Sequence, residues 1–134
     1  MTEEQLNLLT AEQLDAMLQE RRNERSATLT LHTAATGHQV SMYPYSFSAD
    51  FGRISVRIET IAGIEWTNGL RHLAMKVPGV SDIKQRAHQK NEQWRMFDIE
   101  VPLKEEEAST TINRVMLLLI QKLEEYKMIA KHER

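Results

Sequence analysis

Five histidines are the side chains in this sequence best suited to bind a metal ion: His32, His38, His72, His88 and His132. No two of them form an HxH or HExxH pair. His32 and His38 flank a predicted hairpin loop, so their rings could approach each other across it. Two ligands fall short of the three or four typical of zinc sites, and Asp50 would have to join them. We favour solvated polar roles for both histidines, and we expect no metal or other cofactor.

Paired carboxylates are the second arrangement that could support chemistry. Asp98 and Glu100 alternate with Phe97, Ile99 and Val101, which is the pattern of a strand. Side chains two apart on a strand share a face, so this pair could act as acid and base. Charges also alternate on the solvated face of any amphipathic strand, and we favour that interpretation. The sequence has no cysteine, no Gly-x-Ser-x-Gly elbow and no glycine-rich phosphate loop. The sequence therefore predicts no catalytic residue and favours a protein that is not an enzyme.

The distribution of charge is more informative than its total of -2. Residues 1–20 contain five acids and no Lys or Arg, which gives -5. Residues 71–95 contain six bases and two acids, which gives +4, and residues 97–107 contain five acids and one base, which gives -4. A nearly neutral chain therefore holds three blocks of alternating sign.

The basic block has two interpretations. Bases interleaved with an aromatic residue could follow a nucleic-acid backbone and stack a base, through Lys84, Arg86, Lys90, Trp94 and Arg95. Alternatively, the N-terminal helix or the run Glu105–Glu107 lies against the basic block and neutralises it. The small net charge favours this second interpretation, since nucleic-acid binders usually carry a strong basic excess.

The elements that must position these residues follow from periodicity and capping. Thr2 with Gln5 and Thr10 with Gln13 form two capping boxes in the N-terminal helical segment 1–22. Alternating residues predict strands at 27–33, from Val40, at 53–59 and at 96–101, with a further strand at 80–86. We expect Pro44 to end the second strand or to lie at a sheet edge.

A short middle helix should run from Thr67 or Asn68 to Val77, and the C-terminal helix should span 102–132, with Ser109 as a second possible start. Its apolar surface is wider than one stripe, which indicates either two buried sides or one side for a partner. The order α-β-β-β-α-(β)-β-α predicts an α+β fold with a mainly antiparallel sheet of four or five strands and helices over one face. That order is similar to the topology of small bacterial secretion chaperones, although no residue motif carries the similarity.

Length and composition set the class of protein. A chain of 134 residues with 41% hydrophobic content suits one domain, 1–134. No apolar run approaches a membrane span, and the N-terminus is acidic where a signal peptide is basic, so we expect a cytoplasmic protein.

These features favour a non-enzymatic protein-binding factor, such as an adaptor, inhibitor or chaperone-like accessory protein, acting as a homodimer. The predicted partner surface comprises Arg53, Arg57, Trp94 and Met96, and the predicted self-association residues are Leu117, Leu118 and Ile120. Nucleic-acid binding is the alternative function, and a small metal-dependent enzyme is a third.

Overall fold

The computed structural model describes residues 2–19, 21–22, 28–48, 53–87, 93–102 and 108–131. In chain order, its elements are α1 (Glu3–Asn7), α2 (Ala11–Gln19), β1 (Leu29–His32), β2 (Gln39–Ser48), β3 (Arg53–Thr60), α3 (Ile64–Ala74), β4 (Asp82–Ala87), β5 (Arg95–Pro102) and α4 (Ala108–Glu125). The predicted α+β fold is confirmed. None of the described helices is both long and apolar enough to cross a membrane.

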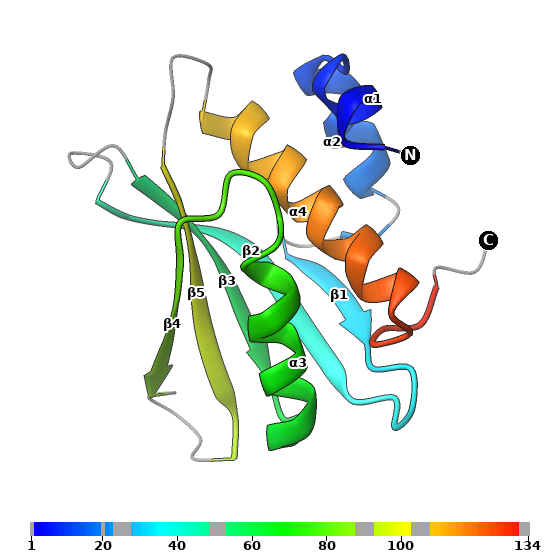
Figure 1. Cartoon of the computed structure of the whole chain (residues 1–134), viewed down its shortest axis with the longest axis vertical. Helices are drawn as coiled ribbons and strands as arrows, with labels where there is room; N and C mark the ends of the chain where they lie inside the picture. The colour runs from blue at the N-terminus through cyan, green and yellow to red at the C-terminus, as the bar shows by residue number, and fades with distance from the viewer. Residues whose placement is uncertain are drawn as a thin grey trace.

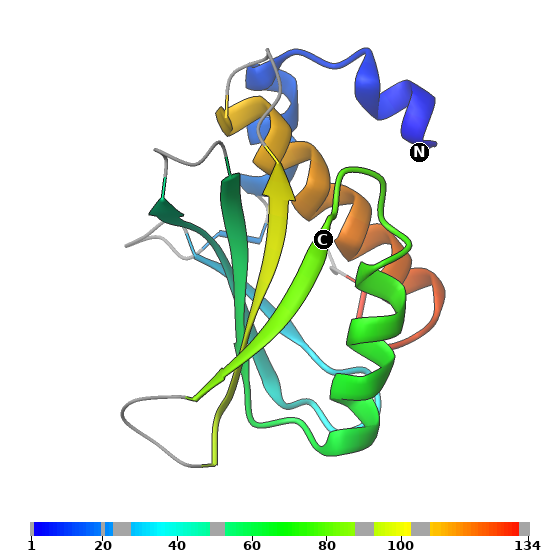
Figure 2. The same ribbon diagram turned by 60° about the vertical axis from the view of Figure 1, so that its left-hand side comes forward.

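The five strands form one antiparallel sheet in the order β1-β2-β3-β5-β4. α3 and α4 lie on one face of the sheet (Figures 1 and 2), and α2 packs against α4. We call this side of the sheet the helix face and the opposite side the outer face. No described helix lies against the outer face (Figure 2).

The helix face forms the core because most of the strand residues that point to it are apolar. Its central side chains are each at most 1% exposed, and they are Val40, Met42, Val56, Ile58, Phe97, Ile99 and Val101. α4 packs on this layer and is also covered by α1, α2 and α3. Burial from several directions explains its wide apolar surface, so two sides of the helix are buried within the chain itself.

The N-terminal segment forms two helices, where the sequence left open one helix or two starts. Both capping boxes are present: Gln5 N donates to Thr2 Oγ1 at 3.2 Å, and Gln13 N donates to Thr10 Oγ1 at 3.2 Å. In return, each glutamine Oε1 accepts from the backbone N–H of its threonine at 2.9 Å. Each box starts a separate helix because it satisfies N–H groups that have no partner within the helix.

The boundaries of three elements differ from those predicted. Pro102 ends β5, and α4 spans Ala108–Glu125 rather than 102–132. After α4, Lys127 takes a positive φ of 58° and the chain turns back to β1, where Ala130 N donates to His32 O at 2.9 Å. α3 begins at Ile64, ahead of the predicted caps, and β2 continues through Pro44 to Ser48.

Candidate functional site on the outer face of the sheet

The outer face carries polar and aromatic side chains in rows that cross four strands. Residues directly opposite each other in antiparallel strands share a face. One row runs Tyr43–Arg57–Asp98–Lys84, and the row beside it runs Ser41–Glu59–Met96–Arg86. Strand register alone therefore brings together residues from four distant parts of the chain.

Arg57 and Asp98 form the centre of this face. Arg57 Nε donates to Asp98 Oδ1 at 2.7 Å and Arg57 Nη2 donates to Oδ2 at 3.0 Å, a two-bond geometry that fixes the guanidinium plane. The hydrogen bond to Asp98 raises the pKa of Arg57 above its ordinary value. The same guanidinium carbon lies 3.4 Å from the centre of the Tyr45 ring, within cation–π range.

Asp98 is 3% exposed, so the prediction that it is a solvated surface carboxylate is wrong. Arg86 Nε donates to Asp98 Oδ2 at 3.3 Å, so two guanidinium groups bind the one carboxylate. The sequence pattern showed the face of the strand but not these partners. Burying a carboxylate is tolerated here because the charge is paired and hydrogen-bonded.

Tyr43 extends the ordered network on β2. Its hydroxyl donates to Glu59 Oε1 at 2.8 Å. Burial, reinforced by the neighbouring Glu59 carboxylate, raises the pKa of Tyr43 to about 12. Tyr43, Tyr45 and Glu59 were absent from the predicted surface. The expectation that Pro44 ends the second strand or lies at a sheet edge left Tyr45 unassigned, although the alternation of Tyr43 and Tyr45 was visible in the sequence.

The basic block pairs with acids of β5. Lys84 Nζ lies 3.1 Å from Glu100 Oε1, and Arg86 binds Asp98. The described contacts therefore neutralise part of the block within the chain. The partners are Asp98 and Glu100 rather than the N-terminal helix, and the run Glu105–Glu107 lies outside the described residues.

The predicted partner residues are only partly brought together. Arg57 and Met96 share the outer face, but Met96 is only 8% exposed. Trp94 precedes β5 and is half-buried. Arg53 is the first residue of β3, and its side chain lies outside the described part of the structure.

Those predicted nucleic-acid residues that the structure describes do not form one surface. Arg95 lies opposite Ala87 and Thr60, in the register of the helix face, whereas Lys84 and Arg86 lie in outer-face rows. Alternation along β5 separates Arg95 from them. Lys90 lies outside the described residues.

The predicted self-association residues are buried within the chain. Leu117, Leu118 and Ile120 are 6%, 7% and 4% exposed. These side chains offer almost no surface to a second copy while the surrounding elements stay packed. Self-association remains a prediction, and it needs a different surface.

The histidines give no metal centre in the described part of the chain. No group of three or more described His, Asp or Glu side chains is placed to hold an ion. His32 is exposed, and His38 Nδ1 shares a hydrogen bond with Thr36 Oγ1 at 2.9 Å. His88, His132 and Asp50 lie outside the described residues.

Comparison with known proteins identifies no relative. No family model, curated protein or solved structure gives a significant match to this chain. The function must therefore be argued from the outer face itself.

Proposed function

We propose that this protein is a non-enzymatic protein-binding factor, an adaptor, inhibitor or chaperone-like accessory protein, and that the outer face contacts its partner. The observation that carries the proposal is the Tyr45 ring, which is partly exposed and is held in place by the largely buried Arg57–Asp98 pair, on a sheet face that no described helix covers. Tyr and Arg are enriched among residues that dominate binding energy in protein interfaces.

The order of this face favours binding because less entropy is lost when a partner docks. Immobilising a long side chain at an interface costs roughly 0.5–1.5 kcal/mol. Arg57 already bears two hydrogen bonds and a ring contact, and the Tyr43 hydroxyl is already bound to Glu59. A partner therefore meets side chains whose conformations are set before contact.

The charges of the face suit a protein surface better than a nucleic acid. Lys84, Arg86 and Arg57 are each within 4 Å of a carboxylate on β5. Nucleic-acid affinity depends on cations that can neutralise phosphates. A mosaic of paired charges instead suits a partner that presents both signs, and such complementarity mainly sets specificity and association rate.

Affinity capture from native lysate, with and without nuclease, followed by binding measurements on the purified partner, tests the proposal. We expect a protein that is retained after nuclease treatment. Tyr45→Ala should weaken its binding at least about tenfold, since aromatic anchors dominate interfaces. Tyr126→Ala is the matched control, because Tyr126 is 58% exposed beyond α4, and it should leave affinity within about twofold.

Two outcomes would overturn the proposal. Equal effects of the two tyrosine variants would remove the outer face from the interface. Capture that depends on nucleic acid, and that is lost in Lys84→Ala with Arg86→Ala, would establish the alternative function. Light scattering across concentrations tests the homodimer separately, and a mass of 15.6 kDa at every concentration would reject it.

A further inference from the structure

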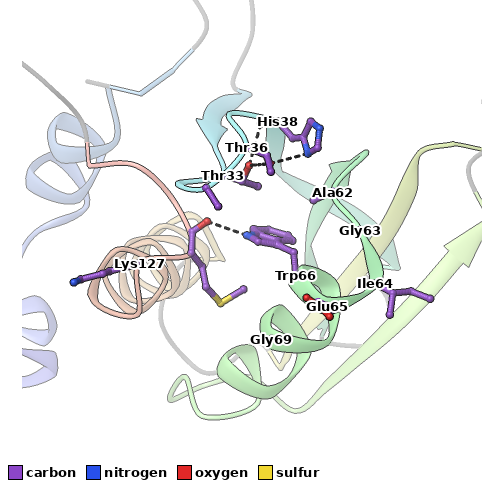
Figure 3. A pocket seen from close by; sticks show the side chains of 12 residues that line it. Thr33, Thr36, His38, Ala62, Gly63, Ile64, Glu65, Trp66, Gly69 and Lys127 are labelled. Atoms are coloured by element: carbon purple, nitrogen blue, oxygen red, sulfur yellow. Dashed lines mark hydrogen bonds between the residues drawn. The ribbon is translucent and has the colours of Figure 1, made fainter.

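A pocket of about 590 Å³ lies on the helix side of the molecule, where three distant segments meet. The β1–β2 hairpin, the start of α3 and the turn after α4 line it (Figure 3). Sites for small molecules usually measure about 300–1,000 Å³ and combine an apolar lining with a few polar groups. The pocket has both properties, and it is separate from the outer face.

Trp66 forms a fixed wall of this pocket. Its indole N–H donates to Met128 O at 2.9 Å, so the ring is tied to the turn after α4 (Figure 3). Gly69 keeps the wall close to Met128, because a Cβ at that position would lie 3.0 Å from Met128 Cε. The indole N–H is already bonded, so the ring offers a ligand a flat and mainly apolar surface.

Small residues leave the space in front of this wall empty. Ala35 of the hairpin, and Ala62 and Gly63 ahead of α3, are among the lining residues. Aromatic rings pack in offset or edge-to-face geometries against an indole, and a methionine sulfur beside a ring adds a favourable contact. The shape and chemistry of the wall therefore suit a planar, mainly apolar molecule.

His38 supplies a polar anchor on the hairpin side. Its Nδ1 shares a hydrogen bond with Thr36 Oγ1 at 2.9 Å, and Thr36 Oγ1 lies 2.7 Å from Thr33 Oγ1. The backbone N–H of His38 donates to Thr33 Oγ1 at 2.9 Å. These bonds orient the ring and leave Nε2 for a ligand. Glu65 also lines the pocket and disfavours an anionic ligand, whereas the side chain of Lys127 points away from Trp66 (Figure 3).

We propose that this pocket binds a small, uncharged aromatic or heteroaromatic molecule whose ring packs on Trp66 and whose polar group hydrogen-bonds to His38 Nε2. The site does not depend on the proposed protein-binding function. It adds a small-molecule ligand to the protein on the side opposite the outer face.

Titration with N-phenyl-1-naphthylamine tests this proposal, because the probe is uncharged, has two aromatic groups and carries a single N–H. We expect saturable binding with a rise in probe fluorescence. 8-Anilino-1-naphthalenesulfonate shares the anilinonaphthalene framework but adds an anionic sulfonate, and it should bind at least about tenfold more weakly. Equal or tighter binding of the sulfonate would overturn the uncharged class of ligand.

Two hairpin variants locate the binding. Ala35→Phe places a ring at an exposed position in the pocket lining and should weaken probe binding at least about tenfold. Ala34→Phe is the matched control, since Ala34 is exposed beside it but is not among the lining residues, and it should bind within about twofold of the unchanged protein. His38→Ala should weaken binding about fivefold through one lost hydrogen bond. Equal affinities in the two hairpin variants would reject this pocket.

A measurement on the unchanged chain keeps the test independent of any variant's folding. The chain has two tryptophans, and their indole N–H groups give separate signals in a ¹H–¹⁵N spectrum. Addition of the uncharged probe should shift the Trp66 signal saturably and leave the Trp94 signal in place, with Trp94→Phe used for assignment. A shift confined to Trp94, or none at either indole, would contradict the proposal.

Discussion

The two faces of the sheet are built from alternate residues of the same strands, yet different interactions hold them. Phe97 and Asp98 are neighbours on β5, and they are 1% and 3% exposed. Phe97 points into the apolar layer under the helices. Asp98 points the other way, into hydrogen bonds from Arg57 and Arg86. Similar burial is therefore reached by packing on one face and by charge pairing on the other.

Because of this difference, the helix face should contribute mainly to stability and the outer face mainly to recognition. Burying apolar side chains gains roughly 1.5–3 kcal/mol for each large residue, so the helix face supplies most of the folding free energy. A satisfied ion pair with low exposure contributes little in net terms, because the charges lose water when they pair. The outer face gains fixed side-chain orientation instead. Substitutions on the two faces should therefore differ in size and in their dependence on pH.

The largest effect should come from the helix face. Phe97→Ala removes a ring from the centre of the core and should lower the free energy of unfolding by about 3–5 kcal/mol, because a cavity adds to the lost transfer energy. Urea denaturation followed by circular dichroism measures the change. Tyr126→Ala removes a ring that is 58% exposed and should change stability by no more than about 0.5 kcal/mol. Similar losses of unfolding free energy in both variants would show that the helix face does not supply most of the stability.

The next effect tests the centre of the outer face. Asp98→Ala leaves Arg57 without its two-bond partner, and it should cost about 2–3 kcal/mol. A double-mutant cycle with Arg57→Leu sharpens the result. The combined loss should be smaller than the sum of the single losses by at least about 1 kcal/mol, because the pair is removed as a unit. Additive losses would show that the two side chains act separately.

Local chemistry in the sequence predicted the elements well. Each capping box joins residues three positions apart, so the two helix starts can be recognised from the sequence itself, at Thr2 with Gln5 and at Thr10 with Gln13. The alternation of Ile54, Val56 and Ile58 likewise predicted a strand with one dry face, and all three lie in β3. Interactions within one turn or one pleat depend on few residues, and periodicity reveals them.

The partners across the sheet could not be predicted in this way. Arg57 and Asp98 are 41 residues apart, and β3 pairs with β5 although β4 precedes β5 in the sequence. Periodicity gives the face of a residue but not the strand beside it. The pocket around Trp66 has the same origin, because three distant segments line it. The turn at Lys127 was not predicted because a lysine, rather than the glycine that usually marks such a turn, takes the positive φ there.

A smaller effect should come from Tyr43, whose contribution to the stability of the outer face should depend on pH. Tyr43→Phe removes the hydrogen bond to Glu59 and should cost about 1 kcal/mol near neutral pH. An unfolded Tyr43 loses its proton near its ordinary pKa of 10.0, whereas the pKa in the folded chain is raised to about 12. Between these values the folded state holds more protons, so this contribution is complete below the lower pKa and is lost as pH rises.

Unfolding free energies of Tyr43→Phe and the unchanged chain, measured over a range of alkaline pH, test this linkage. The difference between the two proteins should narrow above pH 10, since phenylalanine cannot titrate. Comparing the two proteins at each pH cancels the titration of the lysines and the other tyrosines. A difference that stays constant to pH 12 would show that the Tyr43 proton is not linked to folding.

The smallest effect compares the ion pair of the outer face with one outside the sheet. Arg22 binds Asp15 of α2, whose side chain is 47% exposed, whereas the side chain of Asp98 is 4% exposed. The hydrogen bond from Arg22 lowers the pKa of Asp15, so its stabilising contribution is present above the ordinary value of 3.8 and fades as pH falls through the folded pKa. Asp15→Asn should therefore cost at most about 0.5 kcal/mol at neutral pH and nothing once the carboxyl is protonated.

Urea denaturation of Asp15→Asn and Asp98→Ala under identical conditions tests why the two ion pairs differ in their contribution to the free energy of unfolding. Both carboxylates bind arginine, so a similar loss in the two variants would mean that pairing alone sets the energy. A loss several times larger at Asp98 would assign the difference to burial, because water and salt screen the exposed pair but reach the buried one poorly. Raising the salt concentration should then reduce the Asp15 effect and leave most of the Asp98 effect, which would mark the centre of the outer face as a fixed part of the fold.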